Sequence, residues 1–197
     1  MITTHTQLLN ALIEKYGLKS YLEIGVQNPA NNFNLISCKL KTGVDPECEW
    51  TNEINNVTSD EFFERYYSKV NNRTTFDLVF IDGLHHADQV KRDFENSLRC
   101  LSDNGFIVIH DVLPDEEQFT QVPRSTKKWF GNVYQFAMTL NQYDGIGFVT
   151  FNIDCGCTLV WIIPDKVAPP KITDTFDWPT YTSIGRVLLN VTNNIEI

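Results

Sequence analysis

The sequence predicts an α/β fold with a doubly wound, mostly parallel sheet and an antiparallel C-terminal hairpin. Three observations predict it. Helical and strand patterns alternate along the chain as far as residue 111. The strand segments are continuous apolar runs, such as FDLVFI, which is typical of strands that are buried on both faces. After the alternating part, two further apolar runs flank the turn signal Asp154-Cys-Gly, which indicates a hairpin.

The same patterns set the boundaries of each expected element. Strands are expected at residues 20–25, 41–46, 76–82, 105–111, 145–154 and 157–164. Helices are expected at residues 5–17, 30–38, 58–70, 87–101, 126–141 and 181–191. Gly17 ends the first helix, and Thr58 with Glu61 forms a capping box that opens the third. Asp103-Asn-Gly105 is expected to be a turn into the next strand.

One crossover departs from this regular pattern. The stretch between Pro46 and Val57 is too short for a full crossover helix, so the strand that it contains is expected to be minimal.

Composition limits the class of protein. With 197 residues, the chain is expected to form one domain over residues 1–197, with 165–197 as a Pro-rich C-terminal extension. The net charge of −9 argues against partners such as nucleic acid or an anionic membrane surface. No run approaches the roughly 20 apolar residues of a membrane helix. The N-terminus lacks the basic and apolar regions of a signal peptide, and the five cysteines are scattered, so we expect reduced thiols and a cytoplasmic location.

Ionisable residues follow two of the predicted strands at the point where each strand ends. Asp82, His85 and His86 come after the first, and His110 and Asp111 close the second. Ligands of parallel sheets bind outside the carboxyl ends of the strands, so neighbouring strands would bring these side chains together. The alternative is that one histidine caps the helix that follows and the other is exposed. The cluster as a whole favours acid/base or metal chemistry.

A second candidate site precedes this cluster in the chain. Glu23 and Gly25 end the first strand, and Asp45 ends the next, where a carboxylate can accept hydrogen bonds from ribose hydroxyls. Each residue alone could be an ordinary cap or turn residue, but their order on successive strands indicates a cofactor site. The G-x-G-x-x-G pattern is missing, which argues against NAD or FAD and favours a cofactor that has a ribose but no phosphates.

The segments LEIG, GVDP, FDLVFIDGLHH and DNGFIVIHDV together resemble the class I S-adenosylmethionine-dependent methyltransferases. The similarity is strongest to the small-molecule O-methyltransferase group with an Ile-Asp-x-x-His signature, and it covers about residues 18–140, including TKKWFGNVYQFAMTL. It implies a Rossmann-like methyltransferase fold with S-adenosylmethionine as the cofactor. The residues that it places at the cofactor are Glu23, Gly25, Val26, Asp45, Ser59 and Asp82.

The resemblance also implies roles for the Asp/His cluster. His85 would be the general base, and His86 could substitute for it or stack on the cofactor. Asp82 and Asp111 would hold a divalent metal, Mg²⁺ in the first instance. His110 stands where a further acidic residue is often found, which makes it a third ligand candidate and shifts the expected preference towards Mn²⁺.

The expected function is therefore transfer of a methyl group to a hydroxyl of a small molecule, a sugar or another metabolite. The alternative is a methyltransferase-fold binding module without catalysis, because the loop after the first strand has only one glycine and His110 replaces an acid. A hydrolase ranks last, since no Gly-x-Ser-x-Gly turn is present. The loops at 112–128 and 165–197 would shape the acceptor pocket. The hairpin edge and the tail could also pair two copies into a homo-oligomer.

Overall fold

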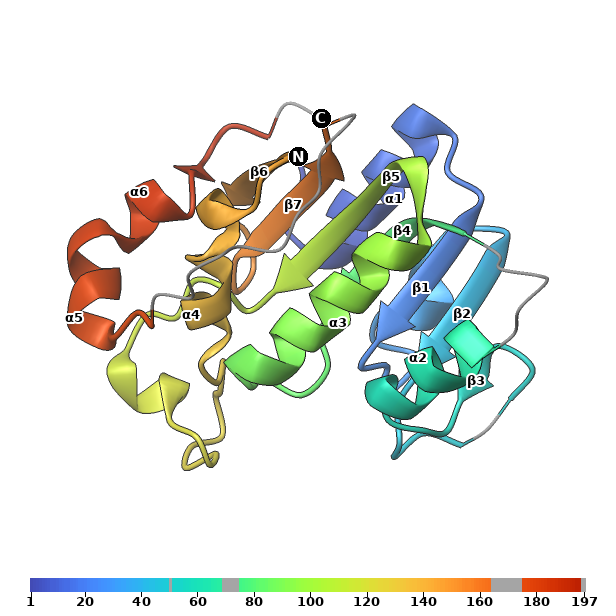
Figure 1. Ribbon diagram of the computed structural model, residues 1–197, viewed down its shortest axis with the longest axis horizontal. Coiled ribbons are helices and arrows are strands. Elements are labelled where there is room, and N and C mark those ends of the chain that lie inside the picture. Colours follow the sequence, from blue (N-terminus) through green and yellow to red (C-terminus); the bar gives the residue numbers. More distant parts are fainter. Residues whose placement is uncertain (50, 69–74, 164–174, 196–197) are drawn as a thin grey trace.

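The computed structural model describes residues 1–49, 51–68, 75–163 and 175–195 (Figure 1). The strands are β1 (Ser20–Ile24), β2 (Leu40–Val44), β3 (Ile54–Asn55), β4 (Phe76–Ile81), β5 (Leu101–His110), β6 (Ile146–Phe151), β7 (Cys157–Ile162) and β8 (Val191–Thr192). The longer helices are α1 (His5–Tyr16), α2 (Ser59–Ser68) and α3 (Ala87–Cys100). The short helical turns are η1 (Phe33–Leu35), η2 (Glu117–Thr120), α4 (Val133–Ala137), η3 (Leu140–Gln142), α5 (Trp178–Thr180), η4 (Tyr181–Gly185) and α6 (Arg186–Leu188).

The strands form one eight-stranded sheet in the order β3-β2-β1-β4-β5-β7-β6-β8. The five strands from β3 to β5 are parallel to one another, whereas β7 runs antiparallel to both β5 and β6. This confirms the predicted fold class, including the antiparallel C-terminal hairpin. The strand β8, which pairs in parallel with β6, was not expected from the sequence.

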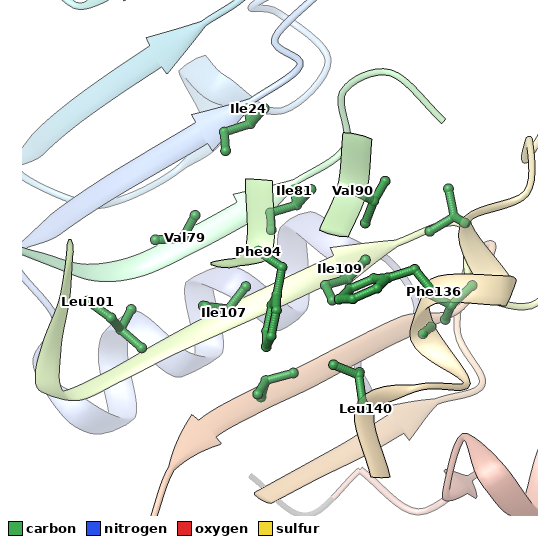
Figure 2. Packing of buried hydrophobic residues seen from close by; sticks show 14 of the residues in the cluster. Ile24, Val79, Ile81, Val90, Phe94, Leu101, Ile107, Ile109, Phe136 and Leu140 are labelled. Carbon is green, nitrogen blue, oxygen red and sulfur yellow. The ribbon is translucent and has the colours of Figure 1, made fainter. Parts of the chain in front are cut away.

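Hydrophobic residues fill both faces of the sheet. Helices α2, α3 and α4 lie on one face and α1 lies on the other (Figure 1). Figure 2 shows the α3 side, where Phe94 packs among strand residues such as Val79 and Ile107. Their neighbours Leu78 and Val108 point the other way, into the cluster that contains Leu8, Leu9 and Leu12 of α1. The alternation follows from the two-residue period of a strand and explains why the strand sequences are apolar throughout.

Two expected helices are much shorter in the structure. The helix expected at 30–38 is only the turn η1, because the Asn32 side chain bonds to the buried Glu23 and Pro29 favours a turn. The helix expected at 126–141 is reduced to α4 and η3. Gly131 adopts a φ of +58°, which is left-handed backbone and cannot belong to an α-helix.

Other boundaries also differ from the expected ones. The turn expected at 103–105 lies inside β5, which already starts at Leu101, and a register irregularity opposite Phe76 and Leu78 accommodates it. The minimal third strand is confirmed as the two residues of β3. The C-terminal helix starts earlier than expected, at Trp178. The ends of the helix expected at 58–70 and of the strand expected at 157–164, and the start of the Pro-rich tail, lie outside the described residues.

Among the helices in the described part of the chain, none is long and apolar enough to span a bilayer.

Phe94→Ala is expected to lower the free energy of unfolding by about 3–5 kcal/mol. The Phe94 ring is fully buried, and its centroid lies 5.4 Å from that of Phe136 and 5.4 Å from that of Tyr143. Its removal would leave a cavity between α3 and the sheet. Urea unfolding followed by circular dichroism measures the change. Leu40→Ala, at a residue that is 58% exposed, serves as the control and is expected to change stability by less than about 0.5 kcal/mol.

Candidate active site

The carboxyl ends of β4 and β5 bring the predicted Asp/His cluster together. These strands are parallel neighbours, with Ile81 paired to Ile109, so the residues that follow them meet at one edge of the sheet. His85 Nε2 lies 3.4 Å from Asp82 Oδ1 and 3.3 Å from Asp111 Oδ2. His110 Nδ1 lies 3.2 Å from Asp82 Oδ1. His85 therefore stands between two carboxylates that come from different strands.

Asp111 owes its position to an unusual backbone conformation. Its φ is +59°, in the left-handed region that non-glycine residues rarely adopt. Successive side chains of a regular strand point to opposite faces, yet Asp111 Oδ2 lies 3.7 Å from Nδ1 of the preceding His110. The left-handed residue turns both side chains towards the cluster. Such strain persists where the surrounding structure enforces it, and it is frequent at functional sites.

Burial and electrostatic interactions within the cluster shift the pKa values of its members. Burial alone would raise the pKa of Asp82, but the charge and hydrogen bond of His110 outweigh it and hold that pKa below its usual range. Burial raises the pKa of Asp111. For His85, burial opposes the charged form, but the hydrogen bond to Asp82 and the charge of Asp111 raise the pKa above its ordinary value. The arrangement thus stabilises a proton on His85 once it has been taken up.

Segment 129–132 fixes the other side of His85. The Trp129 ring stacks on the imidazole, with centroids 5.1 Å apart and an interplanar angle of 19°. The amide of Asn132 donates to the His85 carbonyl at 3.1 Å. Gly131 packs so closely that a Cβ there would lie 1.9 Å from the same carbonyl oxygen. Among the four aromatic residues at 129, 130, 134 and 136, Trp129 alone is not buried in the core.

His86 is separated from this arrangement. It occupies the N-cap position of α3 but makes no side-chain capping bond, and its ring meets the edge of Trp129 at a centroid distance of 6.3 Å. The contacts of the described residues do not join it to Asp82 or Asp111. The structure therefore distinguishes the two histidines that are adjacent in the sequence.

Gly25 and Asp45 lie at the ends of the neighbouring strands β1 and β2. Gly25 has a φ of +92°, and a Cβ there would lie 2.1 Å from the Asp82 carbonyl oxygen. The glycine is thus needed for contact between the ends of β1 and β4. The Asp45 carboxylate accepts the amides of Gln27 at 2.7 Å and Glu47 at 2.8 Å, which holds it at the carboxyl end of β2.

The side chains of Glu23, Val26 and Ser59, also expected at the cofactor, contact other residues of the protein. Glu23 is 1% exposed and accepts hydrogen bonds from the Tyr21 hydroxyl at 2.6 Å and the Asn32 side-chain amide at 2.9 Å. The bond to Asn32 connects the end of β1 to the loop that follows it. Val26 is buried in the core on the α1 side. Ser59 Oγ accepts a hydrogen bond from Gln89 at 3.0 Å.

The stability of the wild type is expected to fall, relative to that of Glu23→Gln, as the pH rises from about 5 to about 8. Burial raises the pKa of Glu23 from its ordinary value of 4.5 to about 8. Across this window the unfolded chain releases the proton and the folded chain keeps it, which costs on the order of 3 kcal/mol by pH 8. Thermal unfolding at several pH values measures the difference. A constant difference would contradict the prediction, and Glu14→Gln, at an exposed residue, is the control.

Two cavities lie at opposite ends of the sheet. One of about 400 Å³ is lined by Gln27 and Glu47, whose amides bind Asp45, and lies at the carboxyl ends of the strands. The other, of about 1020 Å³, is lined by residues such as Asp77, Gly105 and Trp161 at the opposite end. None of the candidate residues lines the larger cavity. The candidate site is therefore identified by the chemistry of its side chains and not by the volume of a cavity.

The chain is similar to a known protein family and to solved structures. Residues 31–112 match a family model described as a methyltransferase domain. An O-methyltransferase from Bacillus cereus, solved in complex with SAH, superposes with a TM-score of 0.60 and 14% identity over 82% of this chain and 82% of that chain. The O-methyltransferase TomG of Streptomyces achromogenes, involved in tomaymycin synthesis and solved with SAM, superposes with a TM-score of 0.55. The two are 14% identical over 80% of this chain and 78% of that chain.

A further solved structure agrees. The SAH-bound methyltransferase of Podospora anserina has a TM-score of 0.56 and 14% identity over 80% of this chain and 77% of that chain. At such identities the likeness shows the fold, which is that of the class I methyltransferases. The resemblance seen in the sequence is confirmed at the level of the fold.

Mg²⁺, the divalent metal first implied by the resemblance, does not match the donor atoms around Asp82 and Asp111. Mg²⁺ requires near-octahedral oxygen ligands at about 2.0–2.1 Å. Here His85 Nε2 stands 3.4 and 3.3 Å from the two carboxylate oxygens, and His110 Nδ1 stands 3.2 Å from Asp82. Two imidazoles therefore border the space, and this donor set suits Mn²⁺ or Zn²⁺ better than Mg²⁺.

Two residues near the site were missed in the sequence. Asp154, in the turn between β6 and β7, lies 2.7 Å from His5 Nδ1 and 3.8 Å from His110 Nε2. His5 is the first residue of α1 and belongs to none of the motifs identified in the sequence. The position of Asp154 follows only from the sheet register, because β7 pairs His110 with Cys157 and so brings the hairpin turn beside the candidate site.

Proposed function

We propose that the protein is an S-adenosylmethionine-dependent O-methyltransferase that acts on a hydroxyl group of a small molecule. The observation that carries the proposal is His85, held between Asp82 and Asp111 at the carboxyl ends of β4 and β5. The same edge of the sheet carries Gly25 and Asp45 at the ends of β1 and β2. A base and a ribose-binding carboxylate thus lie on one edge, as methyl transfer from this cofactor requires. The similar solved structures that contain SAM or SAH support the choice of cofactor.

The loop after β1 and the end of β2 would hold the cofactor. Two backbone amides already fix the Asp45 carboxylate, and its remaining lone pairs can accept hydrogen bonds from ribose hydroxyls. The cavity beside it, of about 400 Å³, offers room at this position. When bound, S-adenosylmethionine would supply a methyl group on a positively charged sulfur, which is a good leaving group.

His85 would act as the general base. The acceptor hydroxyl gives its proton to His85 Nε2, while its oxygen forms the bond to the methyl carbon. Asp82 and Asp111 stabilise the resulting imidazolium, because both carboxylate oxygens lie within 3.4 Å of Nε2. Trp129 stacks on the ring and keeps its orientation. The tasks of the protein are thus to hold the base, align the acceptor and exclude water.

Asp45→Asn is expected to weaken the binding of SAH by about 10- to 100-fold, because a charged hydrogen bond to a ribose hydroxyl contributes about 1.5–3 kcal/mol. Isothermal titration calorimetry measures the affinity. Asp103→Asn, at an exposed residue, is the control and should bind as the wild type does. Failure of the wild type to bind SAH at millimolar concentration would contradict the proposed function. Binding without methyl transfer to any hydroxyl compound would favour the binding module instead.

A further inference from the structure

A second cluster of ligand atoms lies on the far side of His110 from Asp82. It consists of His5 Nδ1, His110 Nε2 and Asp154 Oδ2, which lie within 4.8 Å of one another. The three residues come from the start of α1, the end of β5 and the β6–β7 turn. The distances are 2.7 Å from His5 to Asp154 and 3.8 Å from His110 to Asp154. This cluster includes neither His85 nor the two carboxylates beside it, those of Asp82 and Asp111.

The hydrogen bonds of His110 leave one of its nitrogen atoms unexplained. Nδ1 lies 3.2 Å from Asp82 Oδ1 and donates to this carboxylate, which is an acceptor only. Nε2 is buried and has no hydrogen-bond partner, although the His110 side chain is only 8% exposed. It faces Asp154 Oδ2 at 3.8 Å, which is too long for a hydrogen bond. A buried imidazole nitrogen that makes no hydrogen bond and faces a carboxylate oxygen is a candidate ligand for a cation.

The separations agree with a metal ion as that cation. Nitrogen and oxygen ligands lie about 2.0–2.1 Å from a tetrahedral Zn²⁺, which places two ligands about 3.3–3.5 Å apart. The distances of 2.7 and 3.8 Å fall on either side of this value. The carboxylate–histidine pair formed by Asp82 and His110 is also the usual outer support of a metal-bound imidazole.

The cluster is held in place by its surroundings. The His5 ring stacks on Phe80 with centroids 5.3 Å apart and meets the His110 ring edge-on at 4.7 Å. Thr4 caps the helix that His5 opens. Asp154 adopts a φ of +52°, a left-handed conformation that fixes its direction in the turn. Three rigid elements thus present the ligand atoms before any ion binds.

We propose that His5, His110 and Asp154 form a site for one transition-metal ion of the Zn²⁺ class, supported by Asp82 through His110. Two imidazoles and one carboxylate select such ions over Mg²⁺ and Ca²⁺, which prefer oxygen ligands. Water completes the coordination, since Asp154 is 29% exposed. The ion ties α1 and the hairpin to the end of β5. The site does not depend on the proposed function, because it holds neither cofactor nor acceptor.

Metal binding to the chelator-treated full chain tests the proposal. Titration with ZnCl₂ by calorimetry is expected to show one strong equivalent, and Co²⁺ should give the absorption of a tetrahedral ion. His5→Ala and Asp154→Asn should each weaken Zn²⁺ binding by at least about 10-fold. His5→Cys, which restores a ligand, should recover binding and add a thiolate–Co²⁺ band. His86→Ala is the matched histidine control and should bind Zn²⁺ as the wild type does.

Asp111→Asn separates this site from its neighbours. Asp111 belongs to both rival groups of ligand atoms, one with Asp82 and His85 and the other with His110 and Cys155. The proposal expects Asp111→Asn to keep its Zn²⁺ affinity. It is overturned if wild-type protein binds no Zn²⁺, or if Asp111→Asn loses the ion while His5→Ala keeps it. Binding of SAH, measured in the same samples, reports on the proposed function separately and confirms that each variant is folded.

Discussion

His85→Gln is expected to lower the rate of methyl transfer by about 10²- to 10⁴-fold, which is the usual contribution of a general base. Glutamine has a similar size and can still pack under Trp129, but it cannot take the proton from the acceptor. The affinity for SAH should stay unchanged, because the proposed mechanism assigns His85 to the acceptor and not to the cofactor. Transfer of labelled methyl groups from S-adenosylmethionine to a panel of hydroxyl compounds supplies the assay.

The adjacent histidine provides the control for this prediction. His86→Gln should reduce the rate by less than about 10-fold, since His86 contacts Trp129 and not the carboxylates. Equal losses in both variants would show that the two histidines share the role. An unchanged rate in His85→Gln would remove His85 as the base.

Gly25→Ala is expected to lower the free energy of unfolding by roughly 2–4 kcal/mol and to weaken SAH binding and methyl transfer together. The new Cβ would lie 2.1 Å from the Asp82 carbonyl oxygen, and both groups are backbone, so neither can rotate away. The ends of β1 and β4 would have to separate. Asp82 would then move relative to His85, and a misplacement of the reacting groups lowers the rate steeply.

Gly17→Ala is the matched control, because it has the same left-handed backbone but no clash. Gly17 has a φ of +64°, and a Cβ there would meet nothing within 4 Å. Its replacement should cost only about 1 kcal/mol and leave SAH affinity unchanged. Denaturant unfolding and calorimetry on the two variants measure both quantities. If the variants behave alike, the contact between Gly25 and Asp82 is not needed for the site.

The accuracy of the sequence-based predictions depended on whether local pattern and tertiary contact agreed. Strand β4 was found within one residue of its expected bounds, because a strand buried on both faces is apolar at every position. The helix expected at 126–141 was wrong over much of its length, although its apolar spacing was helical. There, Gly131 turns left-handed so that the chain can pass closely over the His85 carbonyl. A tertiary contact overrode local propensity at a position that supports the candidate base.

In the candidate site, too, some features could be predicted from the sequence and others depend on tertiary contacts. Asp82, His85 and Asp111 could be brought together from the sequence, because parallel topology places the ends of successive strands at one edge. The roles assigned to them remain predictions. The expected part of Glu23 at the cofactor stays a prediction, and the structure adds that its Oε2 atom accepts hydrogen bonds from Tyr21 and Asn32. The pattern of residues located Glu23 on the strand but not the partners of its side chain.

The sequence by itself determined the α/β fold class, the parallel core with its terminal hairpin, and the edge of the sheet where the chemistry lies. These follow from periodicity and from strand ends, which are local properties. Only the tertiary structure decided that His85 and not His86 stands between the carboxylates, and that His5 and Asp154 join His110. Those contacts connect residues as far apart as the first helix and the last hairpin. They depend on strand order and on left-handed backbone at Asp111 and Asp154, which no local pattern encodes.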